Sequence, residues 1–78
     1  MKVLDKVKVI GRGYILVVIP KDIIQMTDEI VFNNIHFEIK GIERLSFIKK
    51  IGLLLSPNNM VGELINIGDE INIIKHND

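Results

Sequence analysis

The sequence predicts a single all-β domain, folded as a small six-stranded antiparallel closed β-barrel. Three observations lead to this prediction. The 78 residues include sixteen Ile and seven Val but no Ala, and β-branched side chains favour strands where Ala favours helices. Apolar runs of strand length recur, and turns of Gly, Pro, Asn or Asp separate them. There is no Cys, so the 47% of hydrophobic residues must form the core without disulfides.

The first two expected strands are separated by a glycine bend. Val3, Val7 and Val9 alternate with Lys6 and Lys8, the pattern of a strand with one solvated face, so the valines should face the core. Gly11-Arg12-Gly13 then bends the chain and leaves the arginine displayed. Residues 14–19 are apolar on both faces, and a proline ends that strand.

A tight hairpin is expected around Asn33-Asn34. Asn tolerates the positive φ of two-residue hairpin turns, and apolar strands flank the pair at residues 30–32 and 35–39. In the second strand Ile35, Phe37 and Ile39 should face the core, and His36, Glu38 and Lys40 the solvent.

Two further strands complete the domain. Residues 51–55 are again apolar on both faces, and Gly68-Asp69 turns the chain into a last strand at 70–74. The barrel is expected to span residues 1–75, with a frayed tail at 76–78.

One internal repeat links two of the turns. The segment from Ile24 to Phe32 aligns with that from Ile65 to Ile73, and each places an acidic turn directly before a strand. We interpret the two segments as equivalent corners of one barrel.

Five segments follow one another along the chain: Gly11-Arg12-Gly13, residues 22–30 (Asp-Ile-Ile-Gln-Met-Thr-Asp-Glu-Ile), Gly41-Ile42-Glu43, Ile51-Gly52-Leu53-Leu54-Leu55 and Gly68-Asp69-Glu70-Ile71. In this order they resemble the second domain of the translational GTPases, most closely that of elongation factor Tu. The resemblance covers nearly the whole chain and implies a six-stranded barrel of the translation-protein type. Asp22 and Thr27 stand where the family usually has Gly, and the loop at residues 44–50 is shorter than the family's.

The resemblance also implies a binding site. In elongation factor Tu this domain holds the aminoacylated 3′ end of transfer RNA, and the matching positions here are Asp5, Arg12 and Glu43. Leu4 replaces an acidic family residue, and Lys49-Lys50 stand where the family has an acidic-amide segment. Arg12 and Glu43 also have a purely structural interpretation, as a salt bridge or a contact at the barrel rim.

The sequence contains no recognisable catalytic or metal-binding motif. There is no Gly-x-x-x-x-Gly-Lys-Ser/Thr loop, so we expect no nucleotide as a partner and neither binding nor hydrolysis of GTP. There is also no Gly-x-Ser-x-Gly elbow. His36 and His76 are the only histidines, too few for a metal site of three or four ligands without further partners. Asp28-Glu29 and Asp69-Glu70 lie at turns, where carboxylates bind local backbone. We expect a non-enzymatic protein without cofactor or metal.

The charge distribution gives no strong indication of a nucleic-acid ligand. Ten Lys and Arg residues balance ten Asp and Glu residues. The basic clusters, Lys6 with Lys8 and Lys49 with Lys50, are either solvated strand faces or a patch that follows phosphates.

We expect a cytoplasmic protein that contacts no membrane. The longest apolar run, residues 14–19, is too short to span a bilayer, and residues 1–10 are too charged for a signal peptide. Because Met1 leads directly into the first strand, we also expect a complete short protein rather than a fragment of a larger factor.

Two functional hypotheses follow. The outward side chains of residues 14–19 and 51–55 must lie under another segment, such as residues 60–67, or against another protein. The first hypothesis is therefore a stand-alone module that docks on a protein partner or self-associates. The second is an RNA-binding accessory domain that uses Arg12 with the two basic clusters.

Overall fold

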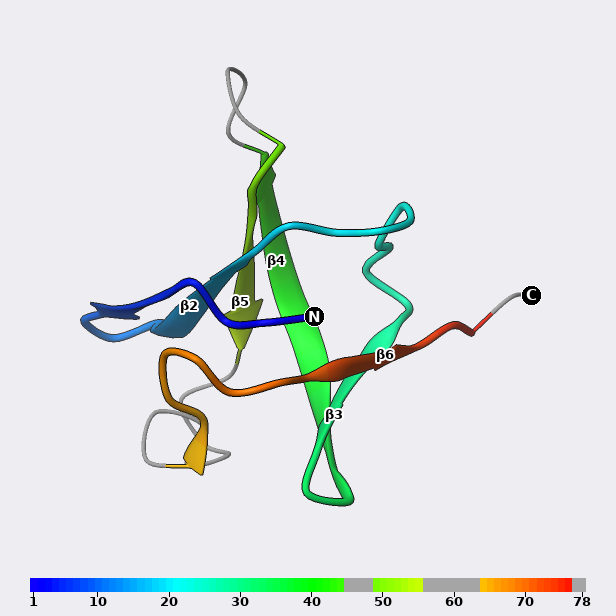
Figure 1. The fold of residues 1–78 in the computed structure, drawn as a ribbon. Helices are drawn as coiled ribbons and strands as arrows, with labels where there is room; N and C mark the ends of the chain where they lie inside the picture. The colour runs from blue at the N-terminus through cyan, green and yellow to red at the C-terminus, as the bar shows by residue number, and fades with distance from the viewer. Residues whose placement is uncertain (45–48, 56–63, 77–78) are drawn as a thin grey trace.

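The fold is a six-stranded antiparallel sheet, which confirms the all-β prediction. The computed structural model describes residues 1–44, 49–55 and 64–76. The strands are β1 (Asp5–Val9), β2 (Gly13–Val18), β3 (Glu29–Phe32), β4 (Ile35–Arg44), β5 (Ile51–Leu55) and β6 (Asn72–Ile74). They are ordered β1-β2-β5-β4-β3-β6, and each neighbouring pair is antiparallel (Figure 1). Within the described residues, no helix is long and apolar enough to cross a membrane.

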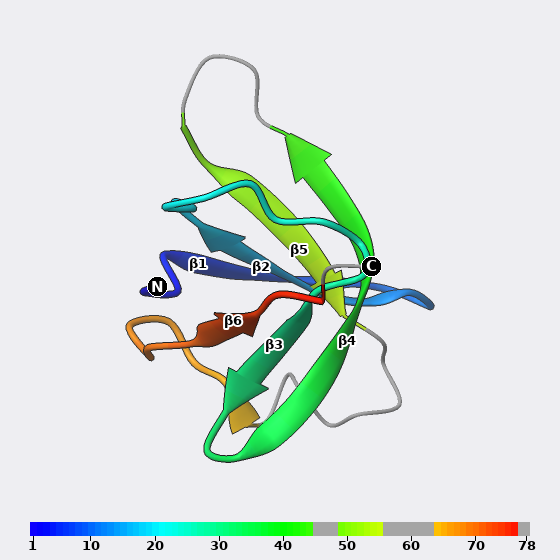
Figure 2. The same cartoon turned by 90° about the vertical axis from the view of Figure 1, so that its right-hand side faces the viewer.

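Strand β4 joins the two halves of the sheet. Its first residues, 35–38, pair with β3, and its later residues pair with β5. The register shifts between Ile39 and Gly41, and a bulge of this kind bends a strand and increases its twist. Figure 2 shows β4 curving from the β3–β4 hairpin to its pairing with β5. This bend lets one continuous sheet curl around its core.

The β3–β4 hairpin has the predicted turn. Asn33 and Asn34 adopt φ angles of 50° and 65°, and they are the two non-glycine residues with positive φ in the described chain. Positive φ at both central positions matches the right-handed twist of the flanking strands.

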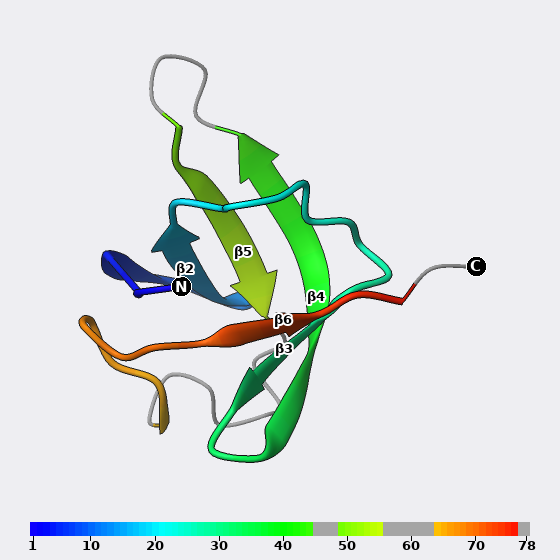
Figure 3. The same ribbon diagram turned by 45° about the vertical axis from the view of Figure 1, so that its right-hand side comes forward.

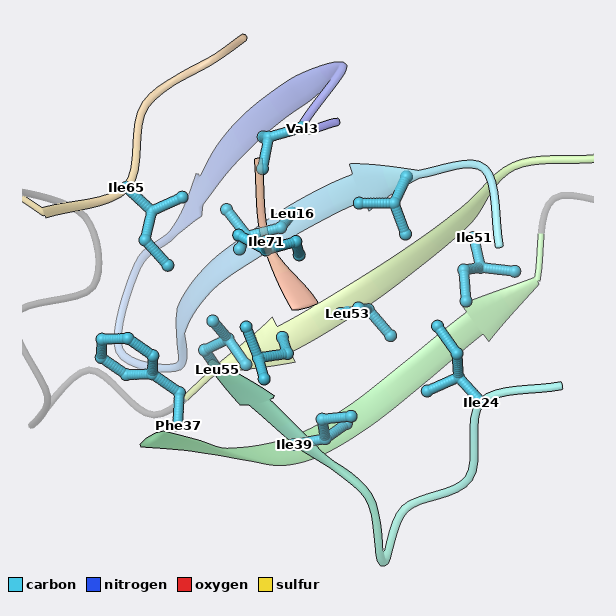
Figure 4. Close-up of a cluster of buried hydrophobic side chains, with 12 residues drawn as sticks. Val3, Leu16, Ile24, Phe37, Ile39, Ile51, Leu53, Leu55, Ile65 and Ile71 are labelled. Atoms are coloured by element: carbon cyan, nitrogen blue, oxygen red, sulfur yellow. The ribbon is translucent and has the colours of Figure 1, made fainter. Parts of the chain in front are cut away.

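Among the described residues, twelve buried apolar side chains form the core and converge from both halves of the sheet (Figure 4). Phe37 and Ile39 of β4 are buried as predicted. The whole set is Val3, Leu16, Val18, Ile24, Ile30, Phe37, Ile39, Ile51, Leu53, Leu55, Ile65 and Ile71.

The structure corrects the predicted orientation of β1. Val3 is buried, but Val7 is 45% exposed and Val9 is half-buried. Val7 pairs with Ile15, whose neighbour Leu16 points into the core, so the valines of β1 lie on the side of the sheet away from the core. Ile35, also expected to be buried, is 43% exposed because it adjoins the hairpin turn.

The two repeated corners are held by the same hydrogen bonds. The Asp28 carboxylate accepts a hydrogen bond from the backbone N–H of Gln25 at 2.8 Å, and the backbone N–H of Asp28 donates to the Gln25 carbonyl at 3.0 Å. The equivalent residues of the second copy repeat both bonds, at 2.8 and 3.1 Å. Val31 and Asn72, which are equivalent in the repeat, pair with each other between β3 and β6. The two copies therefore face each other about a local twofold axis.

The segments that precede β1 and β6 are joined by backbone hydrogen bonds. The N–H of Val3 donates to the carbonyl of Asp69 at 2.9 Å, and the N–H of Gly68 donates to the carbonyl of Val3 at 2.8 Å. Met1 and Ile71 exchange two further bonds of 2.7 and 2.8 Å. Figure 3 shows these segments side by side. Strands β1 and β6 do not pair, so the sheet is not a closed ring of strands and the predicted closed barrel is not confirmed.

The start of the expected frayed tail makes specific contacts. His76 donates its backbone N–H to the Asp28 carboxylate at 3.2 Å, and its ring nitrogen Nε2 lies 2.5 Å from Glu29 Oε1. These contacts hold His76 against the corner before β3. Residues 77–78 lie outside the described residues.

Candidate functional site

The side of β1, β2 and β5 that faces away from the core carries apolar side chains. Because Leu16 points into the core, its neighbours Ile15 and Val17 lie on the opposite side. The strand registers align Val7, Ile15 and Leu54 in one row across three strands. Val7 is exposed and the other two are half-buried. We call the following set the outer face: Val7, Val9, Ile15, Val17 and Leu54.

The predicted cover of this surface is only partly described. Residues 60–63 of the segment 60–67 lie outside the described residues. In the remainder, Ile65 belongs to the core, and Leu64 and Ile67 are 39% and 60% exposed.

A small hollow lies on the same side of the sheet, over β4 and β5. Gly41 and Gly52 form part of its lining and leave it without side chains at those positions, and Arg12 and Glu43 contribute to its rim. The hollow measures about 150 Å³ and is here called the glycine hollow. A Cβ atom at Gly52 would lie only 2.8 Å from Cγ2 of Ile15, so the close approach of the two strands requires glycine there.

Two of the three residues matched to the elongation-factor site therefore line the same hollow. These are Arg12 and Glu43. The ion pairs of the described residues include none between them, so the structure does not support a salt bridge, whereas a contact at the barrel rim stays a prediction. Asp5 is placed elsewhere, because the row from Asp5 to Glu43 runs through Val17 and Gly52. Three strand spacings separate the ends of that row by about 14 Å. The Asp5 carboxylate accepts the N–H of Lys6 at 2.8 Å.

The four predicted basic residues do not form one patch. Lys8 lies opposite Tyr14, at the start of β2, whereas Lys50 precedes the residue that pairs with Val18, at the end of β2. Four residues of strand correspond to about 13 Å. Lys6 Nζ donates to the Ile65 carbonyl at 3.0 Å and lies 5.8 Å from the centroid of the Tyr14 ring, so its ammonium group supports the fold.

Lys49 and Lys50 instead join two basic residues that the sequence analysis did not single out. Lys21 and Arg44 line the same hollow of about 480 Å³, together with Asp22. Its apolar lining consists of Pro20, Ile23, Ile24 and Ile51. We call this the end hollow, because it lies where β2 and β4 end and β5 begins. The strand order would have indicated this grouping of basic residues. Because β5 lies between β2 and β4 and is antiparallel to both, the ends of β2 and β4 and the beginning of β5 lie at one edge of the sheet.

A polar cluster at the corner before β3 has a structural role. Asp28 is buried and its carboxylate lies 2.6 Å from Lys75 Nζ, which also donates to the Ile23 carbonyl. The hydrogen bond from Lys75 and that from the N–H of Gln25 lower the pKa of Asp28, which burial alone would raise. Glu29 lies between His36 and the C-terminal His76, with an oxygen 3.5 Å from Nδ1 of His36.

The carboxylates of the repeat thus bind backbone and neighbouring side chains, as their position at turns predicts. The portion of the chain that the structure describes contains no group of three or more His, Cys, Asp and Glu side chains that could hold a metal ion.

In comparisons with known proteins, no family model, curated protein or solved structure matches this chain.

Proposed function

We propose that this chain is a non-enzymatic cytoplasmic binding module, a small β-barrel of the elongation factor Tu domain 2 type whose outer face docks on another protein molecule. The apolar row of Val7, Ile15 and Leu54 carries the proposal. Each buried Å² of apolar surface contributes about 25 cal/mol, so a partner that covers this row gains free energy from the contact. An apolar face of this kind on a small domain is typical of a protein interaction site.

The barrel of this proposal closes through the residues that precede β1 and β6. The backbone bonds of Met1 and Val3 with residues 68–71 support closure, because they link the two edges of the sheet outside the regular strands. Closure would leave the outer face as the surface of a rigid cylinder, and rigid surfaces bind with a smaller loss of conformational entropy.

The charges around the outer face favour a largely apolar contact with a polar margin. Asp5 and Glu43 end the neighbouring row, whose middle positions are Val17 and Gly52. This arrangement of apolar centre and charged rim is the usual anatomy of a protein interface. The partner is another protein or a second copy of the chain.

Charge substitution on the outer face tests this proposal. Val7→Lys places a charge in the row, and Ile35→Lys is its matched control, because Ile35 is a strand residue of nearly equal exposure on another part of the molecule. Sedimentation equilibrium over a range of concentrations measures self-association, and a photo-crosslinking amino acid at position 7 or 35 detects a partner in living cells.

We expect self-association or crosslinking that depends on position 7 and is retained in Ile35→Lys. A monomeric chain without a position-7 crosslink, or equal effects of the two substitutions, would contradict the proposal.

A second candidate function is binding of an RNA 3′ end at the glycine hollow. The observation that favours it is that Arg12 and Glu43, matched by position to the elongation-factor site, line one hollow without pairing to each other. Titration with transfer RNA at two salt concentrations tests it: Arg12→Ala should weaken binding, and wild-type binding should weaken at higher salt. Absence of binding at low salt would reject this candidate.

A further inference from the structure

We propose that the end hollow binds the phosphate groups of a nucleotide, either free or as part of an RNA strand. This inference rests on Lys21, Arg44, Lys49 and Lys50. None of these residues belongs to the outer face or the glycine hollow, so the proposal does not depend on either function considered above.

The end hollow concentrates positive charge in a neutral protein. Four cationic side chains and the single carboxylate of Asp22 give it three net positive charges. The whole chain has a net charge of zero, so the rest of the molecule carries three net negative charges. Clustered charge of one sign in a concave surface attracts and retains ligands of the opposite sign. The balance of charges over the sequence therefore conceals a local anion site.

Within the described part of the chain, the cations of the end hollow form no ion pair. The ion pairs of the described residues involve the N-terminus, Lys40, Lys75 and the two histidines, and none of the four basic residues of this hollow. A neighbouring hollow of about 220 Å³ provides the contrast. There, the N-terminal amino group lies 3.1 Å from Glu70, and Lys75 pairs with Asp28. Lys21 and Asp22 line both hollows, so Arg44, Lys49 and Lys50 are the cations that distinguish the end hollow.

The shape and lining of the end hollow favour a nucleotide over a bare anion. Its volume of about 480 Å³ is within the roughly 300–1,000 Å³ range of small-molecule sites. Ile23 is 69% exposed, so its side chain offers apolar contact to a sugar or base while the cations meet the phosphates. Among the described residues of the lining there is no aromatic side chain on which a base could stack, so these residues give little discrimination among bases.

Binding of a fluorescein-labelled ten-nucleotide oligouridine, followed by fluorescence anisotropy at 50 and 200 mM NaCl, tests the proposal. For a single strand the logarithm of affinity falls by about 0.7 per neutralised phosphate for each tenfold rise in salt. Three or four engaged cations therefore predict a loss of about 20- to 50-fold over this range. Competition by ADP or inorganic phosphate identifies the source: displacement at millimolar concentration indicates a free nucleotide, and resistance indicates the strand.

Charge-matched variants localise the site. Arg44→Gln/Lys49→Gln removes two cations of the end hollow and keeps part of each aliphatic stem. Lys2→Gln/Lys8→Gln removes two exposed cations elsewhere and gives the same net charge. We expect at least a tenfold loss of affinity and a shallower salt dependence for the first variant, and a change within twofold for the second. Thermal melts establish that all variants are folded.

Three results would overturn the proposal: no binding of oligouridine or ADP by the wild type at 50 mM salt, equal losses in the two double variants, or a loss confined to Arg12→Ala. The last would assign the phosphate to the glycine hollow instead.

Discussion

Substitution of Gly52 by alanine gives a direct test of the close approach of β2 and β5. The new Cβ would lie 2.8 Å from Cγ2 of Ile15, whereas ordinary carbon contacts begin near 3.4 Å. Because this methyl group sits on a β-branched side chain with few rotamers, the overlap must be relieved by strand movement. Overpacking of this kind costs about 1–3 kcal/mol, and replacing glycine within a strand returns about 0.5–1 kcal/mol. We expect a net loss of about 1–2 kcal/mol in the free energy of unfolding.

Gly41→Ala is the matched control, since its Cβ would meet Leu54 at an ordinary 3.4 Å and its φ is not positive. This variant should be neutral or slightly stabilising in urea unfolding. The loss at Gly52 corresponds to a fall of about 4–16 °C in Tm for a domain of this size. In an Ile15→Ala background the clashing methyl group is absent, so Gly52→Ala should destabilise the domain by about 1 kcal/mol less than it does in the wild type. Equal stabilities for Gly41→Ala and Gly52→Ala would refute the reasoning.

Three further predictions follow from the described contacts. The pKa of Asp28 is lower in the folded than in the unfolded state, so its contribution to stability is present above the unfolded pKa and is lost as the pH falls through the folded pKa. Asp28→Asn should therefore lower the midpoint of urea unfolding at pH 7 and reduce the fall of that midpoint in acid. Lys75→Met should have the same two effects. Asn34→Val should cost about 1–2 kcal/mol, measured as a lower Tm, because a β-branched residue is strained at a φ of 65°, while Asn34→Gly should not destabilise. If the barrel closes as proposed, the amides of Val3 and Ile71 should exchange with deuterium as slowly as those within the β2–β5 ladder, and fast exchange at both would indicate an open sheet.

Local features of the fold could be predicted from the sequence because local residues determine them. The Asn33-Asn34 turn follows from the tolerance of Asn for positive φ, and the core positions Phe37 and Ile39 follow from strand alternation. The orientation of β1 could not be predicted in this way. Alternation separates the valines from the lysines, but the register with β2 decides which set faces the core, and that register is a non-local property.

The same limit applies to the candidate sites. Resemblance alone placed Arg12 with Glu43, and the structure brings them to one hollow. The end hollow combines residues from three strand ends that are far apart in the sequence, so Lys21 and Arg44 had no local signal. Their meeting depends on β5 lying between β2 and β4, and no short pattern in the sequence determines that order.

The internal repeat explains why the end hollow can differ from the rest of the molecule. Both copies keep the corner that the fold needs: an acidic residue bonded to the backbone three positions earlier, and buried isoleucines at Ile24 and Ile65. The residues before each corner are not equivalent, because Lys21 of the first copy corresponds to Gly62 of the second. The first copy thus has a lysine at a position where the second has glycine, and this lysine is one of the four cations that line the end hollow. The corner bonds do not involve Lys21, and the proposed phosphate ligand would give its charge a role.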